Sequence, residues 1–437
     1  MTLTLIITVI TCILLILSII KFPSFKIKNI TIETFWVIAL IGAIFILLTK
    51  RIPLDNLISS LTSDSSINPI KIIILLLSLS MLSITLDELG FFEFIASRAI
   101  KYVKNSQYKL FFIIFIMVAV LTVFTSNDIV ILTFTLFICY FSKTTKINPI
   151  PYLVMEFVTA NTCSMFLIIG NPTNIYISSA FEIGFYEYFK VMFLPTLIAT
   201  ITSIIILLLI FKKQLDKPIN IDSFEEKNIK NKTLSIISLI HLLACTILLA
   251  ISSYINLDMW LITLIFCLSL SIILLVFFIY KKENNYLFKV YKRLPYTLGI
   301  FVLSMFTIVL SLDYYDVTKS LKESFSLLSS NDLLTTLIYG FTSALSDNII
   351  NNIPMSLLYT SIISNSQELN YLSIYATIIG SNIGAFLTPI GALAGMMWMH
   401  ILKDQKVKFS FLDFTKDGVL LTFPILTTSL LALWLVL

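Results

Sequence analysis

The sequence predicts an all-α polytopic membrane protein made of two inverted repeats, each with a re-entrant helical hairpin and a broken transmembrane helix. Of its 437 residues, 58% are hydrophobic and 13% are charged, whereas a soluble domain is about 45–50% apolar and about 25% charged. Many apolar runs approach the ~20 residues with which a helix crosses a bilayer. Two related polar interruptions and the placement of basic residues then divide the chain into repeats.

The first repeat is predicted at 1–211. Three apolar runs come first, at about 3–20, 35–48 and 70–86. The stretch 87–104 has apolar residues on one helical face and Arg98, Lys101 and Lys104 on the other, so we expect it to lie in the membrane interface.

The first hairpin is predicted at 109–142, with its tip at 125–128. Lysines flank both ends of this segment, which places both ends in the cytoplasm. The span at 150–180 is predicted to unwind at 170–174, where a glycine and a proline interrupt it. A further apolar run at about 191–211 ends the repeat.

A polar linker at 212–232 holds six lysines and four acidic residues and is predicted to be cytoplasmic. The second repeat, 233–437, repeats the order of the first. Its parts are spans at about 234–251, 260–280 and 296–312, a hairpin at 331–364 with its tip at 346–352, a broken span at 370–402 and a last span at about 419–437. The flanks of this hairpin lack basic residues, so it is predicted to enter from outside. Alternation of about ten full spans then inverts one repeat relative to the other, as in many secondary transporters.

The two polar interruptions have equal spacing. Phe124 and Pro172 are 172 − 124 = 48 positions apart, and Phe341 and Pro389 are 389 − 341 = 48 positions apart. Half-helix ends in such breaks offer N–H and carbonyl groups to an ion or solute. We therefore predict one shared site, with candidate binding residues Thr125, Ser126, Asn127, Asp128, Asn171, Thr173, Asn174, Ser346, Asp347, Asn348, Asn351, Asn352 and Thr388.

Asp128 and Asp347 are the candidates for proton coupling. An acidic side chain at bilayer depth costs at least ~2.5 kcal/mol on insertion scales and is by default a functional hypothesis. Removal from water favours the neutral carboxyl group, so either residue can carry a proton. The alternative is that each aspartate caps the outgoing half-helix, and both roles can coexist. Glu156 is a weaker candidate, whereas His241 and His400 are expected to have structural and interfacial roles.

Other chemistry is poorly supported by the sequence. The net charge of +5 comes from short loops and does not indicate nucleic-acid binding. The five cysteines stand singly in apolar segments, without metal-ligand or redox spacing, and only Cys163 lies near a break and merits a test as a ligand. Neither a GxxxxGK[ST] phosphate loop nor an HExxH motif occurs, so energy must come from an ion gradient, the membrane potential or a separate ATPase subunit.

The sequence resembles the arsenite-efflux permeases of the ArsB type in four stretches: LDELGFFEF at 86–94, FTSND at 124–128, SDNIINNIP at 346–354 and GSNIGAFLTPIGALAGMMWMHIL at 380–402. The likeness runs over about 70–437, and the last stretch is the most specific. The wider group is the ion transporter superfamily, which includes Na⁺/H⁺ antiporters of the NhaD type and carboxylate and other anion transporters.

The resemblance implies the inverted-repeat fold and export of arsenite or antimonite, as the neutral hydroxide, in exchange for protons across the plasma (cytoplasmic) membrane. It also implies a soluble ATPase subunit as a partner in some relatives. Carried over residue by residue, the site includes Asn127, Asp128, Ser346, Asn351, Asn352, Thr388 and Gly391. The stretch GNPTN at 170–174 departs from the arsenite permeases and is closer to the anion and cation carriers.

The leading hypothesis is therefore an arsenite/antimonite–proton antiporter. One alternative is a Na⁺/H⁺ antiporter that uses Asp128 or Asp347. Another is an inorganic-anion or dicarboxylate transporter, but the lack of Arg or Lys near the breaks argues against it. A membrane enzyme or a passive channel is a different class, and no nucleophile–base pair or metal cluster supports an enzyme. The expected partners are a small inorganic solute or ion and the lipid bilayer, with H⁺ or Na⁺ as the coupling ion and no other cofactor. The oligomeric state stays open.

Overall fold

The computed structural model describes residues 1–22, 24–27, 30–63, 68–100, 106–219, 227–252, 255, 257–281, 285–328, 331–364 and 370–437. Helices dominate these residues, which confirms the predicted helical membrane fold. Within the described residues the only sheet is a two-stranded antiparallel hairpin, β1 (Ser24–Ile27) and β2 (Ile30–Glu33). The apolar-run pattern did not predict this hairpin, because it lies in the short connection between two helices.

The first half of the chain contains ten helices in the described ranges. They are α1 (Thr2–Lys21), α2 (Thr34–Leu48), α3 (Leu54–Thr62), α4 (Pro69–Glu88), α5 (Phe91–Ile100), α6 (Gln107–Phe124), α7 (Asn127–Thr145), α8 (Ile150–Cys163), α9 (Pro172–Ala180) and α10 (Phe185–Leu215). The predicted interfacial helix is shorter than expected, since Asp87 and Glu88 belong to α4 and Gly90, with a φ of 77°, separates α4 from α5. Residues 101–105 lie outside the described part.

The second half also contains ten helices in its described ranges. They are α11 (Lys232–Ile251), α12 (Met259–Lys281), α13 (Tyr286–Arg293), α14 (Tyr296–Tyr314), α15 (Val317–Leu328), α16 (Asp332–Ile350), α17 (Asn352–Ser364), α18 (Tyr371–Ile383), α19 (Leu393–Asp404) and α20 (Phe411–Val436). The linker is shorter than predicted, because α10 continues to Leu215 and α11 begins at Lys232.

Eight helical segments of the described chain are long and apolar enough to cross a membrane. They comprise α4, α6, α7, α10, α11, α12, the pair α13–α14, and α20. The predicted full spans correspond to six of these segments, to the shorter apolar helices α1 and α2, and to the two broken spans α8–α9 and α18–α19. A multi-pass protein is thus confirmed, but α6 and α7 are also long enough to cross, so the re-entrant path of this hairpin stays a prediction.

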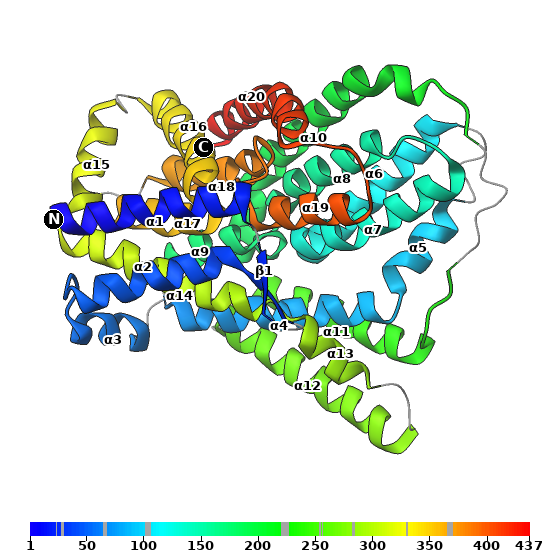
Figure 1. Cartoon of the computed structure of the whole chain (residues 1–437), viewed down its shortest axis with the longest axis horizontal. Helices are drawn as coiled ribbons and strands as arrows, with labels where there is room; N and C mark the ends of the chain where they lie inside the picture. Colours follow the sequence, from blue (N-terminus) through cyan, green and yellow to red (C-terminus); the bar gives the residue numbers. More distant parts are fainter. Residues whose placement is uncertain are drawn as a thin grey trace.

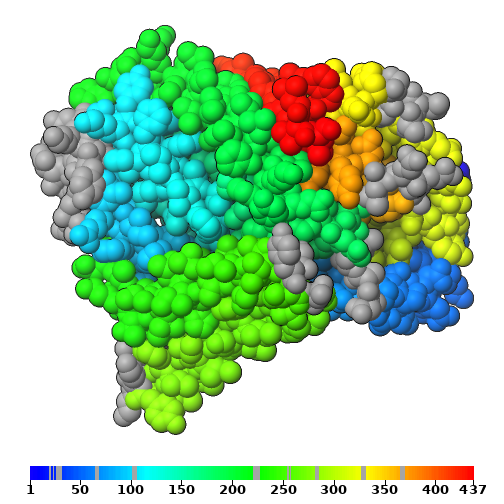
Figure 2. Space-filling model, turned by 180° about the vertical axis from the view of Figure 1, so that it is seen from behind, coloured from blue at the N-terminus to red at the C-terminus, as the bar shows by residue number. Residues whose placement is uncertain are grey.

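Helix packing repeats with a shift of ten helices. Helix α2 packs against α14 and α12 against α4; α7 packs against α19 and α17 against α9; and α10 packs against α20. In Figure 1, α10 and α20 lie in the upper part, α2, α14, α4 and α12 lie in the lower part, and α7, α8, α9, α17, α18 and α19 lie between them. Figure 2 shows the same arrangement from behind, with the end of α12 projecting from the rest. The two halves therefore interlock, whereas their inverted orientation stays a prediction.

Small residues let α16 and α18 approach closely. A Cβ atom on Gly380 would lie 1.9 Å from Ser343 Oγ and 2.5 Å from the carbonyl oxygen of Gly340. A Cβ atom on Gly384, four residues later, would lie 2.6 Å from the Cα of Ala344. Small residues at four-residue spacing allow such backbone contact in membrane helices. This contact sets the second broken span directly against the second hairpin.

We expect Gly380→Ala to separate α16 from α18 and to destabilise the protein by about 1–3 kcal/mol, the usual cost of overpacking. Thermal unfolding of the detergent-solubilised protein, followed by tryptophan fluorescence, measures the effect. Gly299→Ala is the matched control, because its added Cβ would meet only the side chain of Ile73, at 3.3 Å from Cγ2 and 3.9 Å from Cδ1. Equal losses in the two variants would contradict the proposed close contact.

Candidate functional site

A buried hydrogen-bond network joins the two broken spans. Its centre is Asn382 of α18, whose amide oxygen accepts bonds from Ser164 Oγ and Asn171 Nδ2, both at 2.8 Å. The amide nitrogen of Asn382 donates to Asn174 Oδ1 at 2.7 Å. All four side chains are buried. Two residues of the predicted site, Asn171 and Asn174, therefore contact the other half of the chain.

The first break has a local explanation. Pro172 occupies the first position of α9, where its missing N–H is not needed, and the side chain of Asn171 caps the helix by accepting from the Thr173 N–H at 3.1 Å. The Thr173 hydroxyl lies 3.1 Å from Ser381 Oγ of α18. The helix also unwinds earlier than predicted, because α8 ends at Cys163 and two short 3₁₀ turns precede α9.

The tip of the first hairpin lies where it was predicted, between the end of α6 and the start of α7. Asn127 Nδ2 donates to Asn161 Oδ1 of α8 at 3.0 Å, which attaches the tip to the first broken span. Ser126 and Asp128 line a cavity of about 500 Å³. Thr125 instead donates to the Leu121 carbonyl of its own helix at 2.7 Å.

The second tip is narrower than the predicted 346–352. Helix α16 continues to Ile350, and the chain reverses at Asn351 alone, whose φ is 73°. Asparagine tolerates positive φ better than most residues. Asn351 Nδ2 donates to the Ile390 carbonyl at 3.0 Å, and the Asn352 N–H donates to the Gly391 carbonyl at 3.1 Å. This tip is therefore bonded to the backbone of its own broken span.

Asn348 and Thr388, two residues of the predicted site, are hydrogen-bonded to each other. Asn348 Nδ2 donates to the carbonyls of Ala344 and Gly384, at 2.8 and 3.0 Å. Asn348 Oδ1 accepts from the Thr388 N–H and hydroxyl, at 3.0 and 2.6 Å. A second predicted residue, Ser346, has its hydroxyl 3.3 Å from the Tyr359 hydroxyl. The role of these residues in binding stays a prediction.

The buried acids differ in their surroundings. Asp347 is fully buried, and neither of its carboxylate oxygens has a hydrogen-bond partner among the residues that the structure describes. Asp128 lies in the wall of the cavity. Glu156 is also fully buried, but it accepts from the Thr135 hydroxyl at 3.2 Å and from Trp398 Nε1 at 3.4 Å. Of these three carboxyl groups, Asp347 is the one that is both fully buried and without hydrogen bonds from described residues to offset its removal from water.

The cavity lies between α4, α7 and α19 and extends from Ser126 and Asp128 to Glu33, Arg293 and His400. The Arg293 guanidinium binds Asp87 at 2.5 Å and Glu88 at 3.0 Å, so its charge is paired. Burial raises the pKa of Glu33 in β2, and the hydrogen bond from the Thr297 hydroxyl partly opposes that shift.

The two copies meet through their broken spans and not through their tips. Among the described residues, no hydrogen bond joins the two hairpin tips. Leu393 and Met396 of α19 lie between them, since they line both the cavity beside Asp128 and a small void beside Asn351. Whether both tips contribute to one site stays a prediction.

The spacing of 48 residues paired the wrong residues. Pro172 begins α9, whereas Pro389 lies four residues before α19. Gly170 and Gly391 are the positional equivalents, because each lies two residues before its helix.

Sequence reasoning missed four residues of the network: Asn161, Ser164, Ser381 and Asn382. A signal for two of them was present. Asn161 and Asn382 precede Gly170 and Gly391 by equal distances, 170 − 161 = 9 and 391 − 382 = 9. Both also donate to the carbonyl four residues earlier, at 2.8 Å. Cys163, by contrast, lies 3.7 Å from Thr200 Oγ1 of α10 and is not part of the network.

Sided labelling tests where the cavity opens. We expect Ser126→Cys, with the five native cysteines replaced, to react with a membrane-impermeant maleimide in everted vesicles and not on intact cells. The reason is that the cavity reaches from Ser126 to the exposed side chain of Arg293. Arg293 ends the basic stretch 281–293, which the placement of Lys and Arg assigns to the cytoplasmic side. Thr125→Cys is the control and should stay unreactive, since Thr125 is 5% exposed. Reaction of Ser126→Cys only on intact cells would reverse the predicted orientation.

Comparison with known proteins gives consistent results. The family model CitMHS, described as "Citrate transporter", matches residues 30–377. The arsenical pump membrane protein of Escherichia coli is 28% identical over 367 residues, covering 81% of this chain and 83% of the relative. That of Yersinia enterocolitica is 28% identical over 369 residues with the same coverage. The crystal structure of the Alcanivorax borkumensis YdaH transporter superposes with a TM-score of 0.54 at 12% identity, covering 99% of this chain and 96% of that one, which shows a shared fold.

Proposed function

The chain belongs to the citrate transporter family CitMHS, and from that premise we propose that this membrane transporter exports arsenite or antimonite in exchange for protons. The observation that carries the proposal is the similarity to arsenical pump membrane proteins, which extends over 81% of the chain. The protein is a transporter and not an enzyme, so the proposal concerns only its substrate and its coupling.

The cavity supports a small neutral substrate. Its volume of about 500 Å³ is within the range of small-molecule sites. Ser126 and Asp128 line its deep end, and its arginine, Arg293, is already paired with two carboxylates. A neutral trihydroxide can donate hydrogen bonds to such groups, whereas a multivalent anion requires an available cation to offset its desolvation.

Asp128 and Asp347 are the proposed proton carriers. A carboxyl group that faces the cavity can exchange a proton with water, as Asp128 can. A buried carboxyl group without a hydrogen-bond partner is far more stable when protonated, as expected of Asp347. Exchange of protons between these groups and the two sides of the membrane would drive export against the solute gradient.

Growth on arsenite tests the function. Expression in a strain that lacks its own exporter should restore arsenite tolerance, and a protonophore should abolish arsenite accumulation in everted vesicles. Unchanged sensitivity, with membrane expression verified, would contradict the proposal.

The family description favours one second candidate, a carrier of citrate or a related anion. The same everted vesicles separate the two functions. Accumulation of labelled citrate, and not of arsenite, would support the anion carrier.

A further inference from the structure

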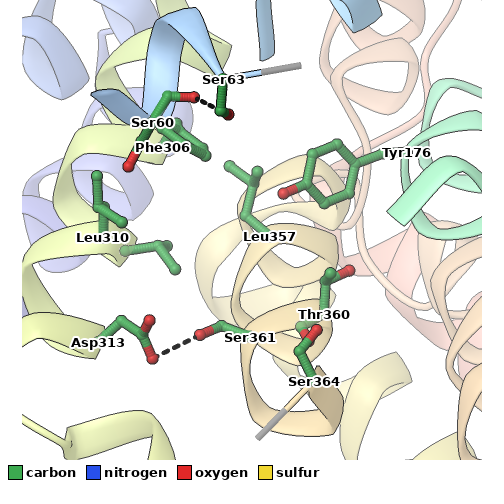
Figure 3. A pocket seen from close by; sticks show the side chains of 11 residues that line it. Ser60, Ser63, Tyr176, Phe306, Leu310, Asp313, Leu357, Thr360, Ser361 and Ser364 are labelled. Carbon is green, nitrogen blue, oxygen red and sulfur yellow. Dashed lines mark hydrogen bonds between the residues drawn. The ribbon is translucent and has the colours of Figure 1, made fainter. Parts of the chain in front are cut away.

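A second pocket lies beside α9. It has a volume of about 240 Å³ and is lined mainly by α14 and α17, with Ser60 and Ser63 from the end of α3 and Tyr176 from α9. Figure 3 shows side chains from these helices around the pocket, with the Tyr176 ring directed toward Leu357. The pocket is separate from the larger cavity, because no residue lines both.

The pocket and the larger cavity occupy corresponding places in the two halves. The cavity is lined by α4, α7 and α19, together with parts of α9 and α14. The helices ten places away from the first three are α14, α17 and α9, and each of them contributes to the pocket. Tyr176 is the fifth residue of α9 and lines the pocket, while Met397 is the fifth residue of α19 and lines the cavity. The correspondence indicates that the pocket belongs to the transport route and is not a packing defect.

A shared hydrogen bond supports this correspondence. Thr85-Leu86-Asp87 ends α4, and Ser311-Leu312-Asp313 lies at the end of α14. Asp87 accepts from the Thr133 hydroxyl of α7 at 2.9 Å, and Asp313 accepts from the Ser361 hydroxyl of α17 at 2.9 Å, as drawn in Figure 3. In each half, an aspartate near the end of one helix thus holds the outgoing arm of the adjacent hairpin.

Hydroxyl groups dominate the polar part of the pocket. They belong to Ser60, Ser63, Tyr176, Ser361 and Ser364. A hydrogen bond between one of these hydroxyls and a bound molecule is worth about 0.5–1.5 kcal/mol, so a molecule with several hydroxyl groups suits this lining.

The charge of the pocket restricts its ligand. Among the described residues that line it, none is Lys, Arg or His, and the one acidic residue is Asp313. An anion would enter a low-dielectric space without a positive partner in the lining, which is costly. A neutral molecule meets no such cost.

We propose that this pocket is a second binding site for the transported solute, separate from the cavity, and that it takes a small neutral molecule with several hydroxyl groups. Trivalent arsenic and antimony hydroxides belong to this class. The assignment rests on the proposed function and deepens it, since it adds a site on the predicted outer side and names the form of the substrate.

Proteoliposomes with the full-length protein and arsenite as the probe test the assignment. Tyr176→Phe and Ser60→Ala each remove one pocket hydroxyl with little change of shape. Together they should raise the KM for arsenite at the face served by the pocket about tenfold, as expected for a loss near 1.4 kcal/mol, and leave the KM at the other face unchanged. Thr196→Val is the matched control, because it removes a buried hydroxyl without a partner from α10, outside both cavities.

Each outcome has a definite meaning. An unchanged KM at both faces, or an equal rise at both, would overturn the assignment while arsenite transport itself stands. Competition by citrate at the pocket face would overturn the neutral ligand class. A wild-type protein that carries no arsenite would overturn the proposed function and this assignment with it.

Discussion

Asp347→Asn is expected to abolish proton-coupled efflux while the protein still folds. Asp347 is fully buried near the second tip, and among the described residues neither carboxylate oxygen has a hydrogen-bond partner. Ionisation of Asp347 therefore places an uncompensated charge in the interior. An ionised acidic side chain at this depth costs about 2.5–3.5 kcal/mol. Asparagine removes the proton-dependent step that this cost controls, so we expect the proton-coupled rate to fall about 100-fold. Asparagine keeps the shape and stays neutral at every pH. Arsenite accumulation in everted vesicles, measured between pH 6 and pH 8, provides the readout.

The control for this variant is Asp332→Asn. Asp332 begins the same helix, α16, and is exposed, so its replacement should leave both the rate and its pH dependence unchanged. A full proton-coupled rate in Asp347→Asn would remove Asp347 from the coupling mechanism. Asp128→Asn would then be the variant expected to lose coupling, since Asp128 is the acid that faces the cavity.

Asn382→Ala is expected to have the largest effect on stability. Asn382 accepts a hydrogen bond from Asn171 Nδ2 and donates one to Asn174 Oδ1. Among the described residues, each of these two atoms makes no other hydrogen bond. A buried polar group left without a partner costs about 1–3 kcal/mol, so two such groups should cost about 2–6 kcal/mol. Thermal unfolding in detergent should show a large fall in melting temperature, together with loss of transport.

Asn370→Ala is the matched control for this prediction. Asn370 caps the same helix, α18, and is exposed, so its loss should cost only about 0.5–2 kcal/mol. If the two alanine variants unfold at the same temperature, the network does not hold the two broken spans together. Asn382→Asp keeps one acceptor at the position and should give an intermediate result.

Much of the fold could be predicted from local properties of the sequence. The length of the apolar runs predicts membrane helices. Pro172, Gly170 and Gly391 mark the breaks, because proline lacks a backbone N–H and glycine permits backbone conformations that other residues avoid. These signals located both hairpins and both broken spans. They failed where the chain departs from local preference, as at the second tip, where α16 continues through the polar residues to Ile350.

Partners in space follow from packing and not from local pattern. The sequence identified Asn171 and Asn174 as polar residues at a break, but their common partner, Asn382, lies 382 − 174 = 208 positions from the nearer of them. Likewise, Asp128 and Asp347 looked equivalent as acids at hairpin tips, and only the folded chain gives one of them a cavity and buries the other. The reason is physical: a helix or a break forms from neighbouring residues, whereas burial and hydrogen bonding depend on which distant helices pack together.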